Sequence, residues 1–229
     1  MGTPSNTVRS GDHFLTFFST KNKASFNGPG ADSALGACRY YEAIRAVAGC
    51  GPNGELLNPT ENFDQWKQRW AFGTASAALT ATYTNAVDLN LERDMHASGT
   101  SQGMAHYVCN YPVNPALPFD NVLNRKNLVA CVAMEYSATP GLNLNGGGIA
   151  QPYVKFLTFA PSGTLIASVN LDARGEKYMP GACVVCHGAS GYSRYSEVPG
   201  GSSPAMEAQF LPFDLNNFKF AAAPAALSR

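Results

Sequence analysis

The spacing of apolar residues predicts two helices in the first third of the chain. The first begins after Asp32 or Ser33, either of which can cap it, and continues to about Val47, before Gly49 and Gly51. Its apolar residues lie close to one helical face: Leu35, Cys38, Tyr41, Ile44 and Ala48. A second helix is expected after Thr60, which can cap it, with its aromatic residues on one side: Phe63, Trp66 and Trp70.

The middle of the chain has strand patterns instead. Five β-rich runs indicate an antiparallel sheet of about five strands, with a turn at 161–163 joining the last two: 79–83, 104–111, 128–136, 153–159 and 164–169. Within the second run, Met104, His106 and Val108 are expected on one face of the strand. The alternate residues Tyr107 and Cys109 belong to the other face. We therefore predict an α+β fold.

Composition excludes several classes of protein. Among 229 residues, 16 Lys and Arg balance 16 Asp and Glu, so no net charge attracts nucleic acid or an anionic membrane. No apolar run is long enough to cross a bilayer, so we expect no transmembrane segment. The first residues contain no apolar core of a signal peptide, so the chain is either cytosolic or a mature, exported form. The sequence also lacks the common hydrolase, nucleotide-binding and zinc-protease motifs.

The motif CVVCH is the main chemical signal. Cys183 and Cys186 are separated by two residues, and His187 follows directly. This spacing lets two sulfurs reach the vinyl groups on one edge of a haem while the histidine meets the iron. A redox dithiol, part of a zinc site and chance are the alternatives. A dithiol normally opens a helix in a βαβ setting, and a structural zinc site needs a fourth ligand that the sequence does not supply nearby.

The motif resembles that of c-type cytochromes. The resemblance implies one covalent haem c, held by Cys183 and Cys186, with His187 as the proximal iron ligand. It also implies export, hence a periplasmic or secreted protein. A late CxxCH behind a β-rich body is similar in architecture to cytochrome P460 and the β-type cytochromes c′. In cytochrome P460 a lysine is cross-linked to the haem, and Lys155 is the loose candidate for that role here.

Three residues are candidates for the distal side of the iron. His96 ranks first, because it lies in LERDMHASGT, where polar residues interrupt the strand pattern and a loop could present it. Met206 could fold back over the ring from the segment after the motif. His106 sits mid-strand among apolar neighbours and could equally be a core residue. His13 is discounted as part of a terminal segment.

Other charged residues could serve a haem, although solvated surface charge is the ordinary role of each. Arg93, Arg174 and Lys177 are candidates to pair with the propionates. Glu135 could act as an acid or base if it faced the haem. We expect it instead on an outer face, in contact with solvent.

The four cysteines outside the motif form an even set that is compatible with two disulfides in an oxidising compartment: Cys38, Cys50, Cys109 and Cys131. The export implied by the resemblance favours disulfides over buried thiols. Cys109 and Cys131 lie on candidate neighbouring strands, so this pair is preferred. A Cys38–Cys50 bridge requires the first helix to stop early, since a helix rises about 1.5 Å per residue.

We therefore expect one domain, 1–229, with an N-terminal helical part at about 30–72, a β-rich part at about 78–170 and a C-terminal haem-c attachment segment at about 175–220. The first functional hypothesis is a monohaem c-type cytochrome that exchanges electrons with a partner protein or small molecule. A P460- or c′-like haem enzyme or gas-binding protein is the second hypothesis. If it were an enzyme, it would be a haem-dependent oxidoreductase. A zinc or dithiol protein without haem is the third.

Overall fold

The computed structural model describes residues 33–74, 79–84, 89–138, 152–173, 175–187 and 219–221. The described helices are α4 (Ala34–Ala43), α5 (Phe63–Arg69), α6 (Asp120–Leu123) and α7 (Gly181–His187). The long strands are β3 (Leu79–Thr84), β4 (Leu91–Thr100), β5 (Gly103–Pro112), β6 (Ala130–Ser137) and β7 (Tyr153–Phe159). The short strands are β1 (Val47–Cys50), β2 (Leu56–Pro59), β8 (Ser168–Val169), β9 (Lys177–Tyr178) and β10 (Lys219–Phe220).

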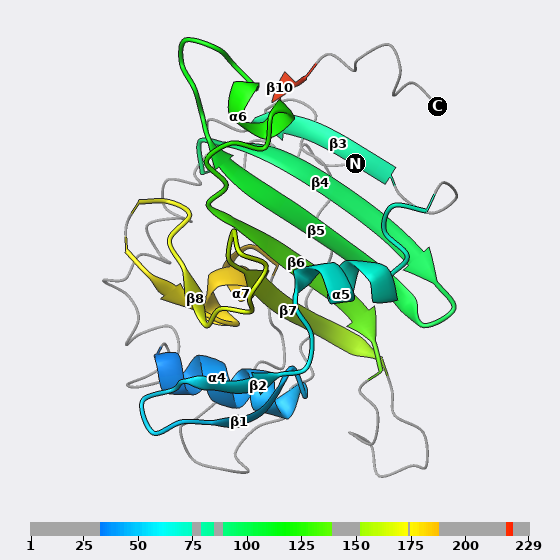
Figure 1. Ribbon diagram of the computed structural model, residues 1–229, viewed down its shortest axis with the longest axis vertical. Coiled ribbons are helices and arrows are strands. Elements are labelled where there is room, and N and C mark those ends of the chain that lie inside the picture. The colour runs from blue at the N-terminus through cyan, green and yellow to red at the C-terminus, as the bar shows by residue number, and fades with distance from the viewer. Residues whose placement is uncertain are drawn as a thin grey trace, which may run out of the picture.

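A six-stranded antiparallel sheet, ordered β10-β3-β4-β5-β6-β7, forms the body of the molecule (Figure 1). The α+β class with an antiparallel sheet is confirmed. Neither β4 nor β10 was among the predicted strands. The run 164–169 does not form a full hairpin partner of β7, because only Leu165 bridges to Phe159 before β8 turns to pair with β9.

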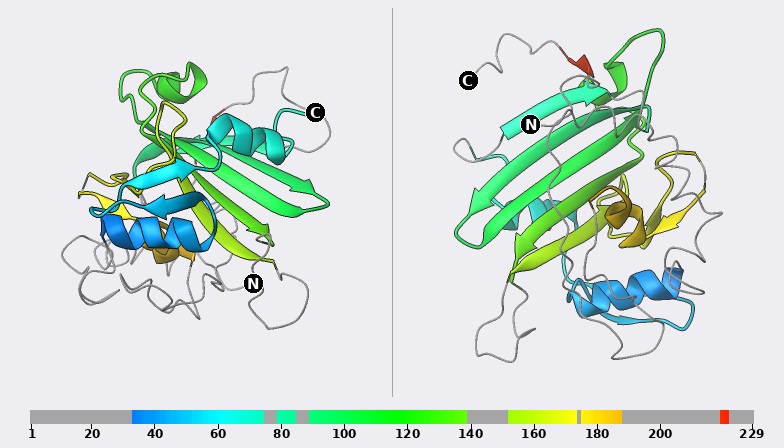
Figure 2. Two further views of the ribbon diagram at one scale, coloured as in Figure 1. Left: turned by 60° about the horizontal axis from the view of Figure 1, so that its bottom comes forward. Right: turned by 180° about the vertical axis from the view of Figure 1, so that it is seen from behind.

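The two faces of this sheet carry different elements. Helix α5 packs on the face that holds Tyr107 and Phe159, which we call the α5 face. Helix α7 packs on the opposite face, the α7 face, where the ring of His187 meets Phe156. Figure 1 shows α5 in front of the sheet, and the rear view in Figure 2 shows α7 in front of β7. The strand pattern separated these faces correctly, since His106 and Tyr107 point to opposite sides.

Helix α4 begins as predicted, but it ends at Ala43 rather than near Val47. The Ser33 side chain caps it by accepting a hydrogen bond from the Gly36 amide. After the helix, Arg45 adopts a φ of 62°, in the left-handed region, and the chain reverses into β1. This early end brings Cys50 back to Cys38, and the two form a disulfide.

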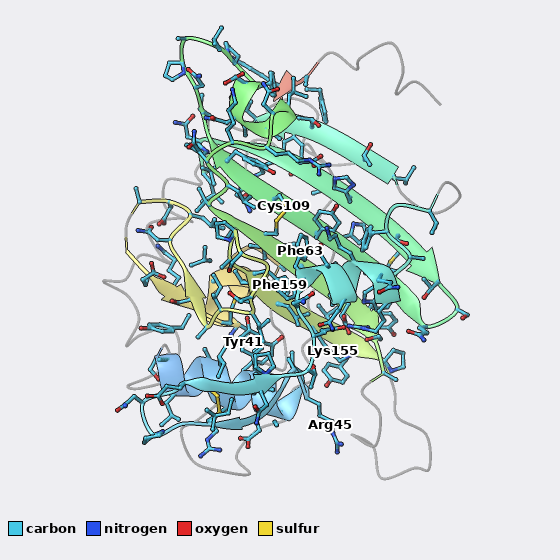
Figure 3. All side chains as sticks on the ribbon, viewed as in Figure 1. Tyr41, Arg45, Phe63, Cys109, Lys155 and Phe159 are labelled. Atoms are coloured by element: carbon cyan, nitrogen blue, oxygen red, sulfur yellow. A yellow bond between two sulfur atoms is a disulfide. The ribbon has the colours of Figure 1, made fainter. Side chains whose placement is uncertain are left out.

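Two tyrosines of α4 cover the exposed edge of β7. Tyr40 donates to the Phe156 carbonyl and accepts from its amide, at 3.1 and 2.7 Å. Tyr41 accepts from the Thr158 amide at 3.2 Å and donates to the Ile166 carbonyl at 2.9 Å. Figure 3 labels Tyr41 between α4 and the sheet. Backbone groups of an edge strand would otherwise be open to pairing with another chain, so these hydroxyls complete the sheet.

Helix α5 is capped by Asn62, not by Thr60. Asn62 and Gln65 exchange side-chain and backbone hydrogen bonds in a capping box. The Thr60 hydroxyl instead donates to the Ala46 carbonyl at 3.2 Å. The aromatic residues of this helix lie on one side as predicted, and Trp66 is fully buried.

A second disulfide joins Cys109 and Cys131, which lie directly opposite each other on β5 and β6. Both the disulfide prediction and the preferred pair are confirmed. Buried side chains from α4, α5, the central strands and α7 form one hydrophobic cluster. Within the described residues, no helix is both long enough and apolar enough to span a bilayer.

Candidate haem-attachment site

Helix α7 carries the CVVCH motif. It follows the buried Met179-Pro180 pair directly, and the Cys183 amide donates to the Pro180 carbonyl at 2.9 Å. Pro180 thus lies at the start of the helix, as its restricted backbone favours. Positions 183, 186 and 187 are spaced i, i+3 and i+4, which places them on one face of a helix. The side chains of 184–186 lie outside the described part of the structure.

The first cysteine of the motif anchors α7 to the core. Cys183 is 6% exposed, and its sulfur lies 3.8 Å from the sulfur of Met179. Met179 is itself buried and accepts a hydrogen bond from the Thr158 hydroxyl at 3.1 Å. Thr158 belongs to β7, so this chain of contacts fixes the motif against the edge of the sheet.

The last residue of the motif lies over the α7 face. The His187 ring is 5.4 Å from the ring of Phe156, centroid to centroid. Phe156 is paired in register with Met134, which is paired with His106, so the three form one row across β7, β6 and β5. His187 and His106 therefore belong to the same side of the sheet.

His106 is half-buried, and its surroundings favour the neutral imidazole. Burial lowers the pKa of His106, and the positive charge of a protonated His187 lowers it further. A neutral imidazole is the form that binds a metal ion.

His96 lies on the opposite face of the sheet, and its expected position in a loop is wrong. It is part of β4 rather than a loop, and its ring stacks on Tyr107 at 4.5 Å between centroids. Its Nε2 lies 2.9 Å from a carboxylate oxygen of Asp94. Because Tyr107 and His106 are consecutive strand residues, the sheet itself separates His96 from His106. The structure does not bring His96 and His187 together.

Charged residues, Glu92 among them, interrupt the apolar pattern of β4, and for this reason the segment was expected to be a loop. Glu92 is nevertheless fully buried, because it accepts hydrogen bonds from the amides of Asn114, Phe119 and Val122. These donors, two of them at the start of α6, replace the water that the charge would otherwise need.

Of the three candidates for the propionates, Arg93 and Lys177 lie within the described residues. Met206, His13 and Arg174 lie outside the described residues. Arg93 extends from β4 over the ring of Tyr83, on the α7 face, and so stays a candidate for a propionate. Lys177 is paired with Asp172 at 2.6 Å.

Glu135 is buried on the α5 face, not solvated as expected. It is 4% exposed and accepts hydrogen bonds from the indoles of Trp66 and Trp70, at 2.8 and 3.0 Å. Arg69 and the Ser137 hydroxyl also donate to it, at 2.9 and 2.7 Å. The sequence did not reveal this cluster because three of the donors, Trp66, Arg69 and Trp70 in and directly after α5, precede Glu135 by 65 or more residues. The alternation within β6 was the available signal, since Glu135 shares the parity of Cys131.

Lys155 completes the cluster from β7. It faces Glu135 across the strand pair, with 3.7 Å between Nζ and the nearest carboxylate oxygen, and it donates to Ser137. Burial lowers the pKa of Lys155 to about 8, against the attraction of Glu135. Burial would raise the pKa of Glu135, but Arg69 and Lys155 overcome that effect and hold it below its ordinary value.

The position of Lys155 also bears on the P460-like resemblance. Lys155 directly precedes Phe156 on β7, so its side chain points away from the face that His187 contacts. Figure 3 shows the labelled Lys155 near α5. The structure therefore does not place this lysine beside the CVVCH motif.

Within the described residues, no group of three or more histidine, cysteine or acidic side chains is arranged to hold a metal ion. Comparisons of the chain with protein-family models, with curated proteins and with solved structures found no match. The CVVCH motif and the face of the sheet on which α7 packs are therefore the features that bear on function.

Proposed function

We propose that the chain is a monohaem c-type cytochrome of the periplasm or extracellular space. Haem c is joined to Cys183 and Cys186 by thioether bonds, formed when each thiol adds across a vinyl group. His187 is the proximal iron ligand. The bound haem supplies a one-electron couple, so the protein takes one electron from a reduced donor and passes it to an oxidised partner protein or small molecule.

The observation that carries this proposal is the setting of the motif. CVVCH forms a short helix whose first cysteine is anchored in the core and whose histidine lies over an apolar row of the sheet. A haem attached there would have its edge held by α7 and an apolar wall beside it. The two disulfides fit the oxidising compartment in which a c-type haem is attached.

The setting is less suited to a thioredoxin-like dithiol. That motif normally opens the helix of a βαβ unit with parallel strands. In the described part of this chain, every strand pairing is antiparallel, and α7 follows a two-residue strand.

Covalent haem retention tests the proposal. The protein should be produced in a host with the haem-c attachment machinery, denatured, and extracted with acidified organic solvent. The haem should stay with the protein and give a c-type pyridine haemochrome. Replacing Cys183 and Cys186 by Ala should abolish retention. The matched control replaces Cys109 and Cys131 by Ala, which removes two sulfurs from β5 and β6 but leaves the motif.

Haem recovered in the organic layer, or a colourless protein that carries zinc, would exclude a c-type cytochrome. Extractable haem would mean non-covalent haem binding, and a colourless protein would leave the zinc or dithiol hypothesis in its place.

A further inference from the structure

The second axial position of the iron is the feature that separates an electron carrier from a gas-binding protein or enzyme. The following inference rests on the proposed haem attachment and concerns the residue that faces His187. The structure narrows the choice of this ligand because α7 packs on only one face of the sheet.

Histidine is the first ligand type to consider, because imidazole is a common ligand of haem iron. The chain has four histidines. His187 is the proximal ligand under the proposed function. His96 is held on the α5 face by Tyr107 and Asp94, and the intact sheet lies between it and α7. His106 is the only other histidine in the described part of the chain, and it lies on the α7 face.

The register of the strands brings His106 toward the motif. Phe156, Met134 and His106 are cross-strand partners in one row, and His187 lies over the Phe156 end. Neighbouring strands are about 4.8 Å apart, so His106 stands roughly 10 Å from Phe156 along the row. A flat ligand covering that row would lie between His187 of α7 and His106 of the sheet.

The surroundings of His106 are apolar and partly exposed. Next along the same face lies the cross-strand pair Met104 and Tyr136, which are 45% and 42% exposed. On the other side of the row, Val108 and Val132 form a further apolar pair. Large apolar side chains grouped around a half-buried histidine fit the flat, apolar surface of a porphyrin.

Met134 is the nearest competing ligand, since it lies in the same row between Phe156 and His106. Its side chain is 5% exposed and packs in the hydrophobic cluster, whereas His106 is half-buried. Because the Met134 thioether packs in the core, it is poorly placed to turn toward a bound haem iron.

We propose that His106 is the distal iron ligand, so that the haem is held by two histidines, His187 from α7 and His106 from β5. This arrangement gives a low-spin iron with both axial positions filled. It favours electron transfer over binding of gases, and a lower reduction potential than histidine–methionine ligation would give.

Optical and electron paramagnetic resonance spectra of the ferric protein test this assignment. The wild-type protein should be low-spin, and His106→Ala should be high-spin with at least a tenfold faster reaction of the ferrous form with carbon monoxide. Added imidazole should restore the low-spin spectrum of His106→Ala. The matched control His96→Ala removes the same side chain from the opposite face and should leave the spectrum unchanged. Met134→Leu and Met206→Ala should also leave it unchanged.

The outcomes separate this inference from the proposed function. If haem is not covalently retained by the wild-type protein, the proposed function is wrong. If haem is retained but His106→Ala stays low-spin, or the wild-type iron is already high-spin, then His106 is not the ligand and only this inference fails. A spectral change limited to His96→Ala, Met134→Leu or Met206→Ala would assign the ligand to that residue. If His106→Ala does not fold, His106→Gln provides the same comparison with a side chain of similar size.

Discussion

The two faces of the six-stranded sheet differ in how deeply their polar side chains are buried and in how those side chains are hydrogen-bonded. On the α5 face, Glu135 and Lys155 are almost completely buried, and several neighbouring donors satisfy them. On the α7 face, His106 is half-buried, and Met104 beside it is 45% exposed. The buried charges of the α5 face are satisfied by neighbours within the chain, whereas on the α7 face an exposed apolar pair, Met104 and Tyr136, adjoins a half-buried histidine. Under the proposed function, the side chains that stabilise the sheet and those that would contact the haem therefore lie on opposite sides of the same strands.

The largest effect should come from Glu135→Ala. The substitution leaves Arg69, Lys155 and two indole N–H groups without their shared acceptor. Removing one partner of a buried ion pair costs about 3–5 kcal/mol in unfolding free energy. Urea denaturation followed by tryptophan fluorescence measures it, since Trp66 and Trp70 report on the site directly. A loss below about 1 kcal/mol would mean that the cluster is not buried as described.

The disulfide between β5 and β6 should have the next largest effect. Replacing both Cys109 and Cys131 by Ala removes a cross-link over a sequence separation of 22 residues. We expect a loss of about 3 kcal/mol in unfolding free energy, mainly because the unfolded chain becomes less constrained. Thermal denaturation of the double variant beside the wild type measures it. Four alkylatable thiols outside the motif in the unreduced wild-type protein would contradict both disulfides.

Lys155 should make stability depend on pH in the alkaline range. Its pKa is about 8 when folded and 10.5 ordinarily, so between these values the unfolded chain binds more protons. Stability should therefore rise with pH across this window, by at most about 1.4 kcal/mol per pH unit from this group. Lys155→Met should remove that contribution, seen as a flatter pH profile of the urea midpoint. Identical profiles for the two proteins would show that Lys155 titrates normally.

Tyr41→Phe should weaken the covered edge of β7 by a smaller amount. The substitution removes the hydroxyl that accepts from Thr158 and donates to Ile166. We expect a loss of about 1–2 kcal/mol, the usual cost of leaving such backbone groups without a partner. Amide hydrogen exchange should also accelerate at Thr158 but not at Val132 in the interior of the sheet. Equal acceleration at both would indicate global destabilisation instead.

The smallest effect on stability should be on the α7 face. In protein produced without haem, His106→Ala should change the unfolding free energy by less than about 1 kcal/mol, because the side chain is only half-buried. The same substitution should change the spectrum of the haem protein. This contrast with Glu135→Ala is the sharpest test of the difference between the faces. A loss as large as that of Glu135→Ala would make His106 a structural residue.

Much of this comparison was predictable from local sequence. The alternation of β5 alone placed His106 and Tyr107 on opposite faces, and the placement of Cys109 and Cys131 on candidate neighbouring strands led to that disulfide pair. The start of α4 at Ser33 and the CVVCH motif are likewise local signals, because capping and i, i+3, i+4 spacing involve residues within one turn of each other.

Whether a charged residue is buried or exposed depended on partners that lie far from it in the sequence. Glu135 was expected to face solvent, yet it is buried against donors from other elements, and so is Glu92. A carboxylate can be buried only where the folded chain supplies those donors, and no local pattern reports them. For the same reason, His96 was expected in a loop and is found in the middle of a strand.

The sequence by itself determined the strand periodicity, the disulfide chemistry and the motif that can hold a haem. Only the tertiary structure decided which face α7 covers, and hence that His187 shares a side with His106 and not with His96. The physical reason is that alternation divides the residues of a strand between two faces but does not determine which face another element covers. That choice is made by the packing of α7 on β7, where Met179 contacts Thr158 and His187 contacts Phe156.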